Sequence, residues 1–120
     1  MKLRFKANSL RLRVNQKEVQ KLESGESLIE QVAFPGGSTL AYVLEVGPTA
    51  AATFTHGTIR VQAPKGEVSA WAQAEEIGMY FDFDVAGSEL RVSIEKDLVC
   101  MDGPPEEVDL DAFPRTAKVC

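Results

Sequence analysis

Hydrophobic and polar residues alternate along most of residues 1–96, and this pattern predicts short β-strands. In the first stretch, Leu3 and Phe5 alternate with Arg4 and Lys6, which is the period of a strand with one buried face. The alternation returns along the chain between short turns that contain Gly, Asn, Ser or Pro. The strands expected from it cover residues 3–6, 10–14, 28–34, 40–46, 52–55, 59–63, 79–85 and 89–94.

The spacing becomes helical after residue 14. Asn15 is a favoured residue at a helix amino terminus, and Glu18 three residues later completes a capping box. Val19 and Leu22 are spaced to share one face of a helix. Gly25 is suited to end the helix, because glycine readily adopts the left-handed conformation that follows many helices. The sequence therefore predicts a short helix between the first two hairpins.

A second copy of this arrangement follows the first. Segment 51–83 repeats segment 2–34, with Pro64 at the start of its helix and Trp71 on the apolar face of that helix. Because each copy reads hairpin, helix, hairpin, we expect two ββαββ repeats at residues 2–46 and 51–95. The residues that match between the copies are Phe5 and Phe54, Arg11 and Arg60, Glu18 and Glu67, Val19 and Val68, Glu26 and Glu75, Phe34 and Phe83 and, after a slip of one residue, Glu45 and Glu95.

The two repeats are expected to form one domain at residues 1–96, followed by an acidic, proline-containing tail at 97–120. A chain of 120 residues is too short for two independent cores. A single ββαββ unit would also leave its apolar face exposed. The expected fold class is therefore α+β and strand-dominated, with the repeats forming one pseudo-two-fold barrel.

The net charge of -5 conceals a basic amino-terminal segment. Up to residue 21, the single acid Glu18 stands against Lys2, Arg4, Lys6, Arg11, Arg13, Lys17 and Lys21. Such asymmetry is typical of a basic binding face, and it is equally compatible with a role in solubility. No apolar run reaches membrane-spanning length and no signal core follows the first charges, so we expect no membrane association and a location in a bacterial-type cytoplasm.

Short motifs in both repeats resemble those of the AbrB transition-state regulators and MazE antitoxins. The first repeat carries a form of the Gly-Asn-Ser-x-x-x-Arg-Ile-Pro motif in Asn8, Ser9, Arg13 and Val14, with Ala7 and Asn15 in place of its Gly and Pro. Gly25-Glu26-x-Leu28 is similar to the Gly-Asp-x-Val that opens the second hairpin of that family. The second repeat carries the related form in Gly57, Ile59, Val61 and Pro64.

This resemblance implies a swapped-hairpin barrel in which one fused chain supplies both units, so that a monomer suffices for folding. The usual function of the family is noncatalytic DNA binding by regulators or antitoxins, through basic residues of the amino-terminal hairpins. Carry-over of the motif and strand alternation together make the DNA-binding candidates Arg4, Lys6, Asn8, Arg11 and Arg13.

The second repeat departs from this pattern, since its matching outward positions are Thr53, Thr55, Arg60 and Gln62. The basic face is therefore expected on one half only, which weakens phosphate binding. This departure leaves open a protein-interaction domain that kept the fold and lost DNA binding. The opening residues and the segments around Glu95 and Phe113 are also similar to a family of small bacterial proteins without an assigned function.

The tail combines acids with spaced apolar residues. One interpretation is a tail that lies on the domain through Val108, Leu110 and Phe113. The other is an arm in which the same residues bind a basic protein partner, as the tails of antitoxins do in the family that the chain resembles.

Signals for catalysis are sparse, and we expect no enzyme activity, no metal and no cofactor. His56 lies in an expected hairpin turn, where exposed polar residues are common. Asp82 and Asp84 share one face of an expected strand, which suits either a cation or solvent. Cys100 and Cys120 lack the close paired spacing of zinc ligands. A small metal-dependent enzyme stays a distant alternative.

Overall fold

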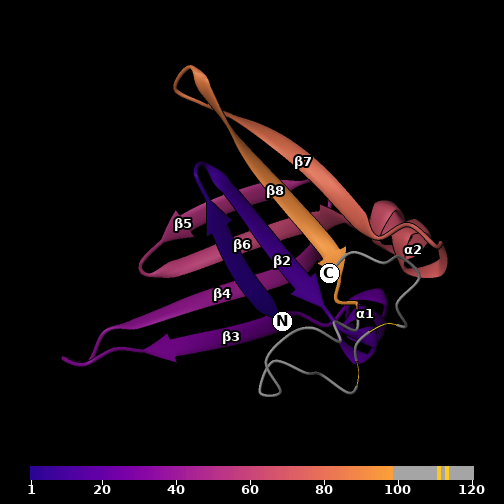
Figure 1. The fold of residues 1–120 in the computed structure, drawn as a ribbon, viewed down its shortest axis with the longest axis horizontal. Coiled ribbons are helices and arrows are strands. Elements are labelled where there is room, and N and C mark those ends of the chain that lie inside the picture. The colour runs from indigo at the N-terminus through magenta and orange to yellow at the C-terminus, as the bar shows by residue number, and fades with distance from the viewer. Residues whose placement is uncertain (99–110, 112, 114–120) are drawn as a thin grey trace.

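The strands and helices of the computed structural model follow the predicted order (Figure 1), and the structure describes residues 1–98, 111 and 113. Each predicted strand and both predicted helices are confirmed, with ends that agree to within a residue or two. In chain order the elements are β1 (Lys2–Lys6), β2 (Ser9–Val14), α1 (Gln16–Glu23), β3 (Leu28–Ala33), β4 (Thr39–Gly47), β5 (Ala51–Thr55), β6 (Thr58–Pro64), α2 (Lys65–Gln73), β7 (Gly78–Val85) and β8 (Ser88–Lys96).

The strands form two four-stranded sheets, with the orders β1-β2-β8-β7 and β3-β4-β6-β5. Neighbouring strands in the chain pair as antiparallel hairpins, whereas the central pairs β2/β8 and β4/β6 are parallel. Each sheet therefore takes one hairpin from each half of the chain. Neither half of the chain alone contains all four strands of either sheet.

The strands form two separate sheets where one barrel was expected, and no closed barrel is present in the described residues. Within the described residues, β1 and β7 are the edges of one sheet and β3 and β5 are the edges of the other, and no edge pairs across to the opposite sheet. The strands of the two sheets cross each other in Figure 1. Sheets that pack face to face are held about 10 Å apart by the side chains between them, too far for backbone pairing.

The core lies between the two sheets and is covered at one end by the two helices. Val19 and Leu22 of α1 and Val68 and Trp71 of α2 are buried there, and the helices lie next to each other in Figure 1. In the described part of the chain, no helix is long and apolar enough to cross a membrane. The buried cluster that joins all these elements consists of Leu10, Leu12, Val14, Val19, Leu22, Leu28, Leu44, Ile59, Val61, Ala63, Val68, Trp71, Met79, Val92 and Ile94.

The predicted ends of α1 are confirmed. Asn15 Oδ1 accepts from the backbone N–H of Glu18 at 3.0 Å, and Glu18 Oε1 accepts from the N–H of Asn15 at 3.0 Å. At the other end, Gly25 has a φ of 91° and donates to Leu22, while Glu26 donates to Lys21. These two bonds satisfy carbonyls that the helix would otherwise leave unpaired.

Candidate functional site

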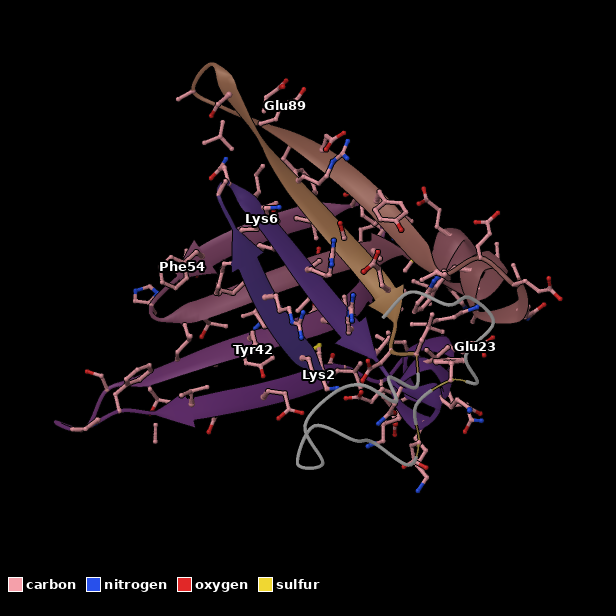
Figure 2. The ribbon with its side chains drawn as sticks, in the orientation of Figure 1. Lys2, Lys6, Glu23, Tyr42, Phe54 and Glu89 are labelled. Atoms are coloured by element: carbon pink, nitrogen blue, oxygen red, sulfur yellow. The ribbon has the colours of Figure 1, made fainter. Side chains whose placement is uncertain are left out.

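The outer face of the β1–β2 hairpin carries a basic strip, defined as Lys2, Arg4, Lys6, Arg11 and Arg13. The hairpin register places Lys2 opposite Arg13 and Arg4 opposite Arg11. Figure 2 shows Lys2 and Lys6 at opposite ends of β1, with Lys6 near the tip of the hairpin. Strand alternation therefore gathers the sequence candidates on one face, as the pattern predicts.

Two acids neutralise the end of the strip that lies near the helices. Lys2 Nζ lies 2.9 Å from Asp97 Oδ2. Glu95 Oε1 lies 3.2 Å from Arg11 Nε and 3.7 Å from Arg13 Nε. Arg13 is the least available candidate, because its side chain is only 22% exposed and its Nε is buried without a hydrogen-bond partner in the described structure.

No acid among the described residues neutralises the other end of the strip. Arg4 and Lys6 are exposed and form no ion pair with any described residue. Arg4 also faces a like charge, since Arg11 lies directly opposite on β2. Like charges in directly opposed positions destabilise a sheet. An anion bound over this end of the strip would relieve that repulsion.

Asn8 is used within the fold. Its Nδ2 donates to the carbonyl of Glu89 at 2.7 Å, and its own carbonyl accepts from the N–H of Arg91 at 3.3 Å. These bonds tie the tip of the β1–β2 hairpin to β8. The structure therefore gives Asn8 a positioning role beside its candidate role in binding.

Glu95 organises the strip, and sequence reasoning missed it as a site residue. Besides the two arginines, its Oε2 accepts from the Tyr80 hydroxyl at 3.0 Å. Partial burial and this hydrogen bond raise the pKa of Tyr80 above its ordinary value. A signal was available in the repeats, because Glu95 matches Glu45 and the paired arginine Arg11 matches Arg60.

The outer face of the other sheet carries no comparable strip. Arg60 forms an ion pair with Glu45, and Gln62 Nε2 donates to Glu45 at 2.9 Å. Thr53 and Thr55 of β5 are exposed and uncharged. The two outer faces therefore differ in charge.

An apolar groove of about 390 Å³ opens between the two sheets. Its apolar lining includes Phe5, Leu10, Leu40, Phe54, Ile59 and Leu90, and its polar lining is Asn8, Ser9 and Thr53, without a charged side chain. Phe5 and Phe54 are 60% and 67% exposed, although both sit on the inner faces of their strands. Large apolar side chains exposed together mark a surface suited to binding.

Part of the tail is held against the domain. The N–H of Phe113 donates to the carbonyl of Asp97 at 2.7 Å, and Lys96 Nζ lies 5.5 Å from the Phe113 ring and 5.7 Å from that of Trp71. Burial lowers the pKa of Lys96. Val108 and Leu110, the other two tail candidates, lie outside the described residues.

The described residues bring together no potential metal site. No three His, Cys, Asp or Glu side chains gather as potential metal ligands in that part of the chain. His56 is exposed in its turn. Arg91 Nε donates to Asp82 Oδ1 at 3.0 Å, and this hydrogen bond lowers the pKa of the Asp82 carboxyl. Cys100 and Cys120 lie outside the described residues.

Comparison with known proteins gives a match to a family whose function is unknown. The model of the family of unknown function DUF7009 matches residues 1–117. A search of curated proteins and a search of solved structures found no match. The expected likeness to a family without an assigned role agrees with this finding, whereas nothing in it bears on the likeness to AbrB and MazE. Since the match covers nearly the whole sequence, the chain belongs to the family of unknown function DUF7009.

Proposed function

We propose that this protein is a noncatalytic binding module that contacts the phosphate backbone of duplex DNA through the free end of its basic strip. One observation carries the proposal. Arg4 and Lys6 alternate on the outer face of β1 without an acid partner in the described structure, and Arg4 lies opposite Arg11. Phosphate oxygens are the anions that repeated Arg and Lys side chains bind in DNA.

The charge distribution also bounds the strength of binding. Arg4 and Lys6 can each meet a phosphate, and the partly exposed Arg11 can do so only in competition with Glu95. Arg13 and Lys2 also lie next to acids, Glu95 and Asp97, and Arg13 is the less exposed of the two arginines. Neutralising two or three phosphates gives weak and strongly salt-dependent binding. The net charge of -5 requires DNA to approach from the side of the strip.

The strand order supports the proposed kinship with AbrB and MazE. Replacing β1 to β4 by β5 to β8 and vice versa turns the order of one sheet into that of the other. The N–H of Arg91 donates a hydrogen bond to the carbonyl of Asn8. In the other sheet, the N–H of Ala41 donates the corresponding hydrogen bond to the carbonyl of Gly57. The ion pair of Arg11 with Glu95 corresponds to that of Arg60 in the second repeat. We therefore propose a fused pair of hairpin-exchanging units related by a pseudo-two-fold axis.

The double substitution of Arg4→Ala and Lys6→Ala is expected to weaken DNA binding and to reduce its salt dependence. Each lost phosphate contact reduces the slope of log affinity against log salt concentration by about 1. The slope of the double variant should therefore be smaller than that of the wild type by about 2. Fluorescence anisotropy of a labelled duplex, titrated between about 50 and 200 mM salt, measures both quantities. Arg60→Ala is the matched control, because it removes an arginine from the outer face of the other sheet.

Two outcomes would contradict the proposal. The wild-type protein could fail to bind the duplex at low salt, which would favour the protein-interaction domain instead. Alternatively, Arg60→Ala could reduce the salt slope as much as the loss of Arg4 and Lys6 does. Circular dichroism spectra of all variants establish that they fold alike.

Replacing Glu95 with glutamine is expected to strengthen DNA binding by up to about fivefold. The substitution frees Arg11 and Arg13 from a competing carboxylate, and partly exposed ion pairs are worth roughly 0.2–1 kcal/mol. Glu45→Gln changes the net charge equally but acts on Arg60 of the other sheet, so its affinity should stay at the wild-type value. Equal gains from both variants would point to net charge alone.

A further inference from the structure

We propose that the outer edge of β5 pairs antiparallel with β5 of a second copy of this chain. The four edge strands of the described sheets are β1, β7, β3 and β5. Three of them carry charge, namely lysines and an arginine on β1, Asp82 and Asp84 on β7 and Glu30 on β3. The sequence of β5 is Ala-Ala-Thr-Phe-Thr, without charge or proline. Charged residues and proline are the usual protection of edge strands against pairing, and β5 has neither.

The turn that follows β5 defines which backbone groups face outward. His56 and Gly57 have φ values of 49° and 74°, which is the two-residue turn with positive φ at both positions. In such a hairpin the flanking residues, Thr55 and Thr58, exchange both hydrogen bonds. By alternation, the N–H and C=O groups of Ala52 and Phe54 point to the free edge.

A two-fold axis at Thr53 satisfies these groups. Ala52 then lies opposite Phe54 of the second copy, where the two residues exchange backbone hydrogen bonds, and the same pair forms again on the other side of the axis. Thr53 lies opposite its own copy in a close pair without backbone bonds. Threonine pairs are favourable cross-strand neighbours, and alanine leaves room for the phenylalanine ring.

The self-complementary register at Thr53 favours a second copy as the occupant, and the charges of the edge strands show why β5, not β1 or β7, can pair in this way. A strand that pairs with itself in this register places like residues near each other, so β1 and β7 would oppose cations to cations and acids to acids. The edge of β5 meets no such repulsion. Pairing also covers Phe54, which is 67% exposed on the groove side of the sheet. In Figure 2, Phe54 lies at the outer end of its sheet and Lys6 on the other sheet, so pairing uses no residue of the basic strip.

Disulfide trapping tests the register. In a chain with Cys100 and Cys120 changed to serine, Thr53→Cys should form a covalent dimer with diamide, which takes up the two electrons and two protons of the paired thiols. The opposed Cα atoms would be about 4.5 Å apart, a separation at which disulfides form. Thr55→Cys is the matched control on the same face, because its two copies would lie roughly 13 Å apart along the strands.

Sedimentation equilibrium tests the association itself. The wild-type chain should change from monomer to dimer as its concentration rises, and Thr53→Lys should weaken the dimer by roughly fivefold or more through the opposed lysines. Thr39→Lys on β4 of the same sheet should leave the dimer unchanged. A wild-type chain that remains monomeric would overturn the proposal. That result would favour an unrelated extended peptide as the strand that pairs with the edge of β5. Equal crosslinking at positions 53 and 55, or a dimer insensitive to Thr53→Lys, would overturn it as well.

Discussion

Replacing Trp71 with alanine is expected to lower the free energy of unfolding by about 3–5 kcal/mol. The indole is only 2% exposed and belongs to the cluster that joins both helices to both sheets. Its Nε1 donates to the carbonyl of Ile77 at 2.9 Å, and Lys96 Nζ lies 5.7 Å from the ring centre. Alanine removes the packing and the hydrogen bond together and exposes Lys96 to a cavity.

Urea unfolding followed by circular dichroism measures this loss. Tryptophan fluorescence cannot be used, because Trp71 is the single tryptophan of the chain. Trp71→Phe separates packing from hydrogen bonding. The carbonyl of Ile77 also accepts from the N–H of Lys96 at 2.9 Å, so it stays bonded when the indole is lost. We expect Trp71→Phe to cost about 0.5–1.5 kcal/mol for the missing bond, together with a smaller packing loss. A cost below about 1 kcal/mol for Trp71→Ala would contradict the central position of the ring.

The elements were predictable because their signals are local. Alternation sets the faces of strands, and the box of Asn15 with Glu18 sets the start of α1 within four residues. The combination of hairpins from both halves in each sheet was not predictable from these local signals, and only the resemblance to AbrB and MazE implied it. It depends on the parallel pairing of β2 with β8, which joins residues 9–14 to residues 91–96 from the opposite half of the chain. Local periodicity carries no information about such a partner.

The candidate site was likewise predictable only where local signals determine it. Strand alternation placed Arg4 and Lys6 on an exposed face. It could not show that Glu95 would engage Arg11 and Arg13, because that contact requires the register in which Arg13 lies opposite Glu95. The groove escaped prediction for a related reason. Phe54 points to the inner face, as alternation requires, and it is exposed because the sheets leave a groove between them there.

A test of whether the two sheets share one core is possible at Leu44 and Ile94. Leu44 lies on β4 of one sheet and Ile94 on β8 of the other, and both are fully buried in the same cluster. We expect Leu44→Ala and Ile94→Ala each to lower the free energy of unfolding by about 2–5 kcal/mol. The reason is that each leaves a cavity between sheets whose hairpins come from both halves of the chain.

A shared core further requires that both variants unfold in a single transition. Each sheet contains strands from both halves, so loss of packing in one sheet removes support from the other. Calorimetry and circular dichroism should therefore give coincident transitions for the wild type and for each variant. Val85→Ala, at an exposed position near the β7–β8 turn, is the control and should cost less than about 0.5 kcal/mol. Two separate transitions, with Leu44→Ala lowering one and Ile94→Ala lowering the other, would show that the sheets unfold independently and that the exchanged hairpins do not couple them.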